Sequence, residues 1–447
     1  MPSRLRIHSH ELGPVADAGA LLAQLRSLGA VLYDSGAGGR FGRTSMVALP
    51  QREVLRWNIG DKGNPLESLE QLLQQAPRMD SCGVPFPGGW VALFSYEIRR
   101  VLEHLPGRHP RSTALPDALL IETRVVLQRD EATGHGTLLH IEDSEDTAAT
   151  QQTRAMMDSV LAALAIPAPV LEWKSNAASV SVPDASLHRA RVAAAREHIR
   201  AGDIYQANLA QAWSVQRPRD TVACYRRLRA LNPPTFGGYL EAAGEALLCL
   251  SPERFLRTQG DAVSTRPIKG TAPRGTNAAE DQAWAAALQR SAKDRAELAM
   301  IVDILRNDLA RVCCAGSVHV SSAMEVEQHP TVHHLVAEIR GRLRPGESVA
   351  TLLRATLPGG SITGAPRIRA MEIIDALEAS ARGPYCGTFG WIGYDGCSDW
   401  NIIIRSAFTA GAAMVLHAGG GIVLDSDPEL EEQETHHKLA GLLAAWA

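Results

Sequence analysis

The sequence predicts an α+β protein whose sheets are largely antiparallel. Two observations lead to this class. Short β-like runs bounded by Gly and Pro gather in clusters over the first 140 residues and again after residue 237. Runs with helical spacing of apolar residues separate these clusters. Strands and helices therefore do not alternate one by one, as they would in a parallel sheet with helical crossovers.

In the first part of the chain, the clearest helix is predicted over 65–75. Asn64 precedes it as an N-cap, Pro65 occupies the first turn, and leucines recur at helical spacing. Short apolar runs bounded by Gly and Pro predict strands at 31–33, 89–94 and 118–127.

An acidic and then polar segment over 142–181 contains two prolines and no strong periodicity. It is the best candidate for a linker between an N-terminal subdomain (1–175) and a C-terminal domain (185–447). An ordinary long surface loop is the alternative.

The second part of the chain shows more regular patterns. Helical spacing predicts helices at 186–201, 280–312, 366–379 and 429–446. A β-rich stretch covers 237–270, and further strands are predicted at 387–394, 400–409 and 413–417.

Composition excludes several classes of protein. The 447 residues are 45% hydrophobic and 21% charged, which allows a large core and excludes global disorder. The formal charge of −4 argues against a nucleic-acid partner, and no apolar run is long enough to span a membrane. The N-terminus lacks the apolar segment of a signal peptide, and the seven cysteines form no C-x-x-C pair. We therefore expect a cytoplasmic protein with free thiols.

A hairpin carries the first chemical signal. The runs 247–259 and 262–269 are strand-like, and a turn at 259–261 sets Glu253 roughly opposite Lys269. A lysine beside a carboxylic acid suits nucleophilic and acid/base chemistry. The alternative is a surface ion pair worth under about 1 kcal/mol.

Two pairs of carboxylates carry the second signal. Asp294 and Glu297 are three residues apart on one predicted helix, and Glu431 and Glu434 are three apart on the last helix. This spacing puts each pair on one helix face. If the two helices meet, the four carboxylates need a cation, and hard oxygen ligands suit Mg²⁺. The alternative is two solvated acidic faces.

Glycine-rich loops and two single side chains complete the pattern. The segment 358–366 opens a helix, and 418–422 follows a strand, so both offer backbone N–H groups to an anion. Arg405 ends the apolar strand 401–405, where a buried guanidinium needs a carboxylate partner. His334 is a candidate catalytic residue, as a proton donor or hydrogen-bond donor to a ligand, with a structural histidine as the alternative. These features indicate a Mg²⁺-dependent enzyme that acts on a small carboxylate or phosphate.

Several long motifs resemble those of the chorismate-utilising enzymes. They are SPERF (251–255), RPIKGTAPRG (266–275), ELAMIVDILRNDLARV (297–312), PGGSITGAPRIRAMEIID (358–375), RGPYCGTFGWIGYDG (382–396), IIIR (402–405) and AGGGIVLDSDPELEEQET (418–435). The resemblance covers essentially the whole chain. It implies two large antiparallel sheets packed as a sandwich, with helices outside and the two halves of the chain interleaved.

The resemblance also implies a role for each site residue. Glu297 and Glu434 match direct Mg²⁺ ligands, and Asp294 and Glu431 match carboxylates that act through water. Contacts to chorismate are implied for Gly270, Thr271, His334, Tyr385, Arg405, Gly419, Gly420 and Gly421. In the N-terminal half, Ser35 and 42–45 resemble a pattern that binds tryptophan in related enzymes, although Thr44 replaces the usual Tyr. We expect a remnant of that pocket.

One position chooses between branches of the family. Anthranilate synthases have Ala where this chain has Lys269, and lysine is typical of the branch that converts chorismate to 4-amino-4-deoxychorismate. There it acts as a covalent nucleophile, with Glu253 as general acid and ammonia as the second substrate. Gln206 stands where the water-adding isochorismate synthases have lysine.

The resemblance implies one protein partner, and two alternative functions stay open. No cysteine lies in a glutaminase-like motif, so a separate glutamine amidotransferase subunit would supply the ammonia. The alternatives are the large component of anthranilate synthase, which Lys269 argues against, and a non-catalytic regulatory protein that binds chorismate or tryptophan.

Overall fold

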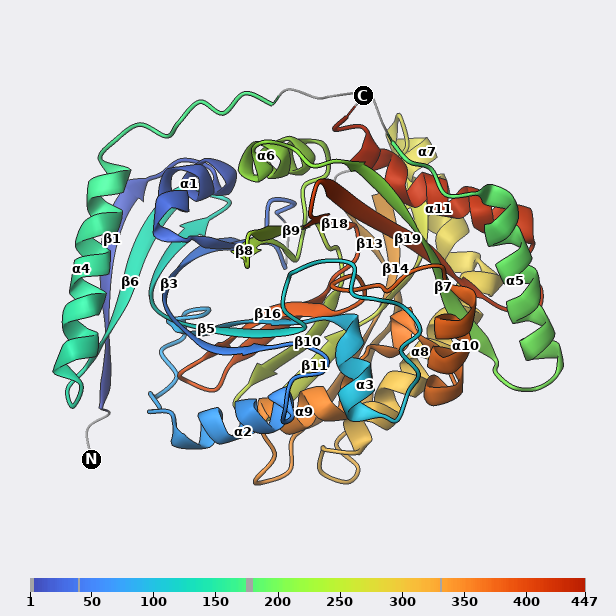
Figure 1. Cartoon of the computed structure of the whole chain (residues 1–447), viewed down its shortest axis with the longest axis horizontal. Coiled ribbons are helices and arrows are strands. Elements are labelled where there is room, and N and C mark those ends of the chain that lie inside the picture. The colour runs from blue at the N-terminus through green and yellow to red at the C-terminus, as the bar shows by residue number, and fades with distance from the viewer. Residues whose placement is uncertain (1–3, 39–40, 174–179, 330–331, 447) are drawn as a thin grey trace.

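A computed structural model describes residues 4–38, 41–173, 180–329 and 332–446 of the chain. It confirms the predicted α+β class, because all the strand pairings within it are antiparallel and helices cover the sheets (Figure 1). No helix in these ranges is long and apolar enough to cross a membrane. The cysteines are free thiols, as expected.

The described strands form one hydrogen-bonded network. They are β1 (Leu5–Pro14), β2 (Val31–Asp34), β3 (Thr44–Trp57), β4 (Gly89–Phe94), β5 (Ala118–Asp130), β6 (His135–Asp143), β7 (Gln206–Gln216), β8 (Gly237–Ala242), β9 (Glu245–Cys249), β10 (Arg254–Gln259), β11 (Ala262–Arg266), β12 (Ile268–Pro273), β13 (His319–Gln328), β14 (Val332–Arg342), β15 (Gly364–Ala365), β16 (Thr388–Gly393), β17 (Ser398–Ile402), β18 (Ser406–Ala410) and β19 (Ala413–Ile422).

The helices lie around this network (Figure 1). They are α1 (Ala18–Leu25), α2 (Pro65–Gln75), α3 (Arg99–Leu102), α4 (Thr147–Leu164), α5 (Ala185–Arg200), α6 (Thr221–Leu231), α7 (Ala278–Arg290), α8 (Ala292–Ala310), α9 (Val349–Thr356), α10 (Arg367–Leu377) and α11 (Pro428–Leu443), with short 3₁₀ turns at Arg26–Leu28, Tyr96–Ile98 and Gly360–Ile362.

Strands from the N-terminal and C-terminal halves of the sequence pair with each other. Strand β2 pairs with β8, and β4 pairs with β16. Strand β5 joins two parts of the network, because its first half pairs with β4 and its second half with β6, while β3 lies along its other edge. The interleaving that the family resemblance implied is therefore present in the hydrogen bonding.

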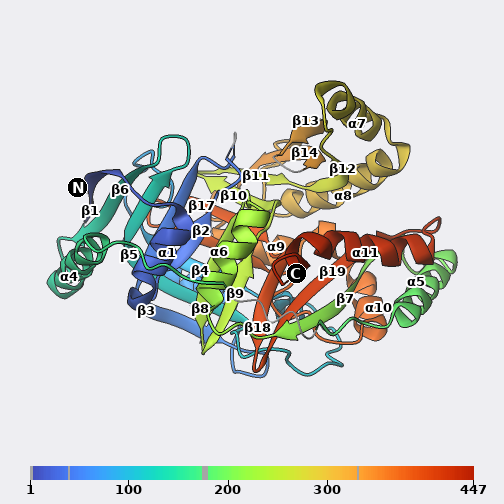
Figure 2. The ribbon, with the colours of Figure 1, turned by 90° about the horizontal axis from the view of Figure 1, so that it is seen from above.

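Two large hydrophobic clusters fill the space between the sheets and the helices. One cluster includes buried residues of α1, α6 and α11, which lie along the top of Figure 1. The other cluster includes residues of α2, α8 and α9 and the aromatic side chains of β4 and β16. Strands β11–β14 and helices α7 and α8 extend from the body as a lobe (Figure 2). This lobe forms one wall of the candidate site.

The structure corrects several predicted elements. The proposed linker contains helix α4, which Asp146 caps and which packs on β6 through buried Thr153 and Val160. Residues 174–179 of that segment lie outside the described residues. The single helix predicted over 280–312 is two helices, because Ser291 ends α7 and its side chain caps α8.

Three further corrections concern residues of the candidate site. The strand predicted over 400–409 is interrupted, and Arg405 lies between β17 and β18 with a left-handed φ of 51°. Residues 418–422 do not follow a strand but lie within β19. The hairpin has its turn at Gly260, but its ladder ends where Arg254 pairs with Arg266. Pro267 interrupts the strand at that point, so Glu253 and Lys269 are not cross-strand partners.

A buried guanidinium ties distant segments together. Arg382 is 2% exposed and pairs with Glu378 through a 2.6 Å hydrogen bond. It also donates to the backbone oxygens of Ile362 and Asn208 and lies over the ring of Tyr96. These hydrogen bonds all end on acceptors inside the protein, so the charge of Arg382 is compensated without water.

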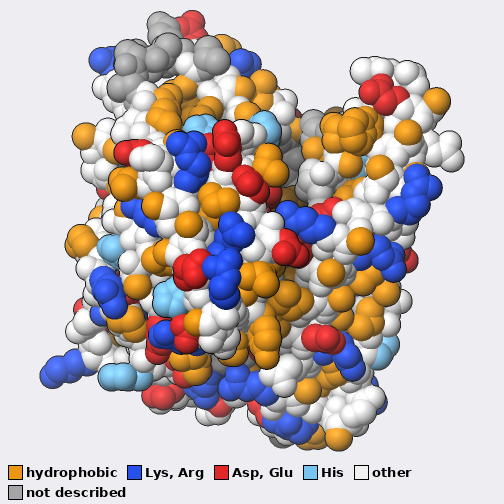
Figure 3. Space-filling model, turned by 90° about the vertical axis from the view of Figure 1, so that its right-hand side faces the viewer, with side chains coloured by type: hydrophobic (Ala, Val, Ile, Leu, Met, Phe, Trp, Pro, Cys, Tyr) orange, Lys and Arg blue, Asp and Glu red, His pale blue; other side chains and the backbone are white. Residues whose placement is uncertain are grey.

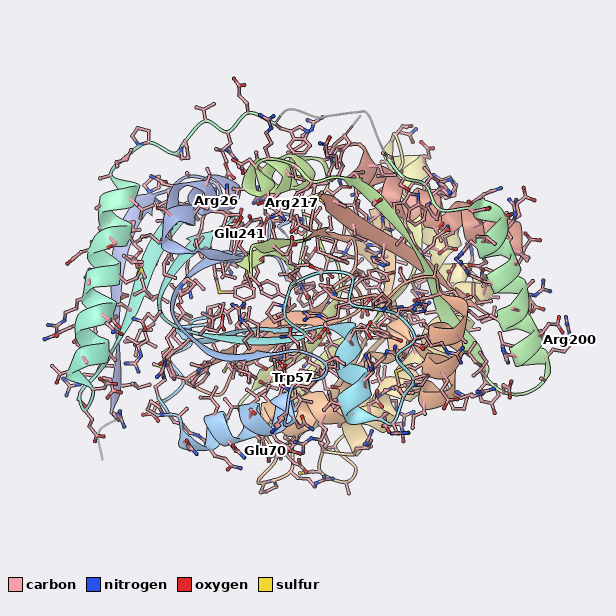
Figure 4. The ribbon with its side chains drawn as sticks, viewed as in Figure 1. Arg26, Trp57, Glu70, Arg200, Arg217 and Glu241 are labelled. Carbon is pink, nitrogen blue, oxygen red and sulfur yellow. The ribbon has the colours of Figure 1, made fainter. Side chains whose placement is uncertain are left out.

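We predict that replacing Arg382 with Met lowers the free energy of unfolding by about 3–5 kcal/mol, because Glu378 is left as a buried, unpaired charge. Chemical denaturation followed by tryptophan fluorescence measures this loss. The control is Arg200→Ala, which removes an exposed pair with Glu197 at the right-hand edge of Figure 4 and should cost under about 1 kcal/mol. Similar losses in the two variants would contradict the role of Arg382.

Candidate active site

The predicted site residues come together where the lobe meets the body. Strand β12 and helix α8 bring residues from the lobe, and β19 and α11 bring residues from the body (Figure 2). Seen from the right-hand side of the molecule, a hollow separates the projecting lobe from the body, and acidic and basic side chains lie together at its base (Figure 3).

Lys269 lies at the centre of this group. Its side chain is 14% exposed, and its Nζ lies 3.6 Å from Oε2 of Glu297 on α8. Gly421 of β19 lies directly beside the amine, because a Cβ built there would be 3.0 Å from Nζ. The same Cβ would be 2.6 Å from Nε2 of Gln206. Glycine at this position therefore keeps space free next to a lysine and an amide.

The other glycines approach the carboxylates. A Cβ built on Gly270 would be 2.9 Å from Cγ of Asp294, and one on Gly420 would be 2.9 Å from Oε2 of Glu431. Gly270 also has a left-handed φ of 79°. The backbone of β12 and β19 thus lies against the acidic side chains of α8 and α11.

Lysines lie among the four carboxylates. Lys293 Nζ is 4.0 Å from Glu297 Oε1 and 3.8 Å from Glu431 Oε1, so it links α8 to α11. Lys438 Nζ is 2.6 Å from Glu434 Oε1 and donates to the backbone oxygen of Gly419. These ammonium groups compensate part of the negative charge of the cluster.

The carboxylates have different electrostatic environments. Burial raises the pKa of Glu431, and the nearby Glu434 raises it further. Burial also opposes ionisation of Glu434, but the ammonium of Lys438, with those of Lys269 and Lys293, lowers its pKa overall. Glu434 is thus the member of this pair that holds its negative charge more readily.

The acidic residues fit a hard cation in chemistry, and they line two facing helices. Carboxylate oxygens on α8 and α11 are the donors that Mg²⁺ prefers, and water molecules commonly complete its shell. The four groups do not meet at one point. In the described part of the chain, one group of three His, Cys, Asp or Glu side chains has its ligand atoms within 4.8 Å of one another. That group lies outside this site. Assignment of Glu297 and Glu434 as metal ligands therefore stays a prediction.

Glu253 is a buried acid with an unusual environment. It is 5% exposed, and its Oε1 accepts a 2.8 Å hydrogen bond from Oγ of Ser361. Burial raises the pKa of Glu253 to about 7, although Ser361 and the charge of Lys269 act in the opposite direction. A carboxyl group that is partly protonated at neutral pH can act as a general acid.

His334 and Thr271 form a pair across β12 and β14. The two residues are cross-strand partners, and Thr271 Oγ1 lies 3.0 Å from His334 Nδ1. Burial lowers the pKa of His334 to about 3, with His329 and Arg405 contributing in the same direction. The imidazole is therefore neutral at physiological pH, so it suits hydrogen bonding rather than charge pairing with a ligand.

Within the described residues, Arg405 makes no direct ion pair with an internal Asp or Glu, which was the alternative to a ligand carboxylate. Its Nη1 donates to the backbone oxygen of Lys438 over 2.7 Å. Burial lowers the pKa of Arg405, whereas the phenol of Tyr385 and the carboxylate of Glu434 favour its charged form. Tyr385 is buried and stacks on His417 with ring centroids 4.9 Å apart. A buried guanidinium beside a tyrosine suits recognition of an anion.

Sequence reasoning missed three polar residues of this site. Lys438 follows Glu434 by four residues, and this i,i+4 spacing was a usable signal. Lys293 lies four residues before Glu297 and carries the same signal. Ser361 lies in the glycine-rich segment 358–366, which was singled out for its backbone. Its contact with Glu253 depends on tertiary packing and has no local signature.

A separate cavity lies between segments of the N-terminal and C-terminal halves of the chain. It has a volume of about 300 Å³ and is lined by residues that include Ser35 and Thr44. These residues belong to the segment where a tryptophan-pocket remnant was expected. Binding of tryptophan to this cavity stays a prediction.

Comparisons with known proteins identify the family. The model of the family described as chorismate binding enzyme matches residues 29–444. The chain belongs to this family, which confirms the resemblance seen in its motifs. The solved structure of anthranilate synthase component I from Streptococcus pneumoniae has a TM-score of 0.79 and 29% identity, covering 90% of this chain and 92% of that one. The isochorismate synthase MenF from Escherichia coli shares the fold, with a TM-score of 0.74 at 21% identity, covering 100% of this chain and 95% of that one.

Relatives with two different names are nearly equally similar. Aminodeoxychorismate synthase component 1 of Escherichia coli is 36% identical over 408 residues, covering 90% of this chain and 86% of the relative. Anthranilate synthase component 1 of Thermus thermophilus is 35% identical over 427 residues, covering 93% of this chain and 91% of the relative. The chain is thus a chorismate-utilising member of the group that contains both synthases, and overall identity does not decide its product.

The environment of Glu253 predicts a pH-dependent stability. An unfolded glutamate has a pKa of about 4.3, so a folded pKa near 7 favours the folded state at acidic pH. This contribution is complete below about pH 4 and is lost as the pH rises through about 7. Glu253→Gln has no such titration. The free energy of unfolding of this variant, relative to that of the wild type, should therefore rise by on the order of 2–3 kcal/mol between about pH 5 and about pH 9. Denaturation curves of both proteins at the two pH values measure this rise, and the same pH dependence of stability in both proteins would refute it.

Proposed function

We propose that this protein is the large component of an aminodeoxychorismate synthase, which converts chorismate and ammonia to 4-amino-4-deoxychorismate for 4-aminobenzoate and folate synthesis. The observation that carries the proposal is Lys269. Its amine lies beside the carboxylates of the candidate site and beside the space that Gly421 leaves free. Anthranilate synthases have alanine at the matching position, and alanine supplies no nucleophile.

The proposed reaction uses two residues of this chain. The unprotonated amine of Lys269 forms a bond to C2 of chorismate, both double bonds of the ring diene shift by one position, and the C4 hydroxyl leaves. Glu253 gives this hydroxyl a proton, so that water departs. Ammonia then adds at C4 and returns a proton to Glu253, both double bonds shift back, and the C2–nitrogen bond breaks to release Lys269 as the free amine. Splitting one displacement into two in this way is the usual advantage of covalent catalysis.

Other residues would hold the substrate. Arg405 and Tyr385 would hold the enolpyruvyl carboxylate, because Arg405 is a buried guanidinium whose charged form the Tyr385 phenol favours. His334 and Thr271 would face the ring, with the backbone amides of the glycines 270 and 419–421 completing the contacts. Mg²⁺ would bind to Glu297 and Glu434, with Asp294 and Glu431 acting through water, and it would supply positive charge for the ring carboxylate.

Ammonia requires a source, and the relatives' names suggest one. Both synthases are named as component 1, which supports a second component. We propose a separate glutamine amidotransferase subunit in that role. Without it, the protein should use free ammonium, more rapidly at higher pH because ammonia is the reactive form.

The second candidate is component 1 of an anthranilate synthase. The nearly equal identity to the Thermus thermophilus enzyme favours it. The two candidates differ in their product, so a product assay separates them. The protein is incubated with chorismate, Mg²⁺ and ammonium, and the products are separated by liquid chromatography and identified by mass. Anthranilate as the main product would contradict the proposed function.

For the nucleophile, we predict that Lys269→Ala lowers ammonia-dependent turnover by on the order of 10²-fold or more, since covalent catalysis is lost. The same chromatographic assay measures the loss, and circular dichroism checks that the variant remains folded. Lys62→Ala, at an exposed surface position, is the control and should keep wild-type turnover. Full activity of the Lys269 variant would rule out a covalent role.

For the metal, we predict that Glu297→Gln and Glu434→Gln each shift the Mg²⁺ concentration needed for half-maximal activity upward by at least about tenfold, because each removes a charged oxygen ligand. Titration of activity with MgCl₂ measures the shift. Glu429→Gln, an exposed change on the same helix α11, is the control. Unchanged titration curves in the two site variants would show that these residues do not bind the metal.

A further inference from the structure

A cluster of histidines lies at the opposite end of the molecule from the candidate active site. Strands β1 and β6 lie beside α4 at the left of Figure 1, whereas α8 and α10 lie at the right. His8 and His140 are direct cross-strand partners in this antiparallel pair. His10 and Glu142 each lie two residues from one of them, so all four side chains share one face of the ladder. This arrangement has no part in the proposed reaction.

The distances within the cluster suit a transition-metal ion. His8 Nε2 is 3.6 Å from Glu142 Oε2, and His140 Nε2 is 3.7 Å from Glu142 Oε1. The ligand atoms of these three side chains all lie within 4.8 Å of one another. Zinc binds nitrogen and oxygen at about 2.0–2.2 Å in a tetrahedral shell, which places two ligand atoms about 3.4 Å apart. Only small movements separate the observed arrangement from that geometry.

The imidazole of His140 gives an independent reason to expect a ligand. His140 is 4% exposed, and its Nδ1 has no hydrogen-bond partner among the described residues. The 3.7 Å from Nε2 to Glu142 is longer than a hydrogen bond. Nε2 is the ring nitrogen that faces Glu142, and a bound ion is one of the ordinary explanations for a buried group whose facing partner lies beyond hydrogen-bond distance.

Glu142 is oriented by a hydrogen bond from outside the cluster. Arg154 Nε donates to Oε1 of Glu142 over 2.6 Å and leaves Oε2 facing His8. An outer hydrogen bond of this kind commonly orients a carboxylate that binds a metal.

We propose that His8, His140 and Glu142 bind a borderline divalent transition-metal ion, of which Zn²⁺ is the representative, with His10 available as a fourth ligand. The rings of His8 and His10 now stack on His140, with centroids 4.8 and 5.3 Å away. Exposed His8 must therefore tilt for its nitrogen to point at the shared ion, whereas buried His140 keeps its position. The ion would fasten β1 to β6 beside helix α4.

The test is a calorimetric titration of the untagged full-length protein with ZnCl₂ in saturating Mg²⁺, which keeps the acidic side chains of the active site occupied. The wild type should bind Zn²⁺ with a dissociation constant on the order of micromolar or tighter, and the thermal unfolding midpoint should rise on binding. His8→Gln, an exposed change, should weaken this binding by at least tenfold and remove the rise in midpoint. His140→Phe should do the same if it folds.

The matched control is His135→Gln, because His135 is exposed at the far end of the same β1–β6 ladder. It should bind Zn²⁺ as the wild type does. Wild-type affinity in the His8 variant would overturn the proposal, and so would the absence of micromolar Zn²⁺ binding by the wild-type protein. Equal weakening in the His135 variant would also overturn it, since the effect would then not belong to this site.

Discussion

Charge compensation between partly buried carboxylates and ammonium groups is the constraint on which the candidate active site depends. Carboxylates on α8 and α11 lie against the backbone of β12 and β19, where glycine leaves room for them. Such a density of negative charge needs positive charge nearby. Lys269, Lys293 and Lys438 supply it from three different elements. The position of the proposed nucleophile is therefore set by the same electrostatics that hold the lobe close to the body.

Much of this arrangement was accessible from the sequence because local chemistry determined it. The N-cap Asn64 and Pro65 predicted α2 with its observed bounds, and the three-residue spacing of the acids predicted two acidic helix faces. The motifs predicted which faces would meet. Of the glycines expected to approach a ligand, Gly270, Gly420 and Gly421 lie against charged or polar side chains, whereas Gly419 lies against the backbone of β7.

The remaining features depend on contacts between residues far apart in the chain. Nothing near Glu253 in the sequence indicates that Ser361, more than one hundred residues away, donates to its carboxyl group. An apolar run such as 400–409 reads as a continuous strand, yet the backbone turns at Arg405 so that its guanidinium reaches the last helix. Pro267 interrupts the hairpin, but the point where the ladder ends follows from the pairing with β14 and β17.

The pairing of β2 with β8 and of β4 with β16 limits how the chain can be shortened. Strand β5 holds β4 in place, because it pairs with β4 along its first half and with β6 along its second. A fragment that began near residue 185 would keep all of the proposed catalytic side chains and lose β2 and β4. The outer edges of β8 and β16, now covered, would then expose unpaired backbone groups flanked by apolar side chains. Bare edges of this kind recruit other chains. Such a truncation would thus yield an aggregate instead of a minimal enzyme, and chimeras between family members should exchange β2, β4, β8 and β16 as one unit.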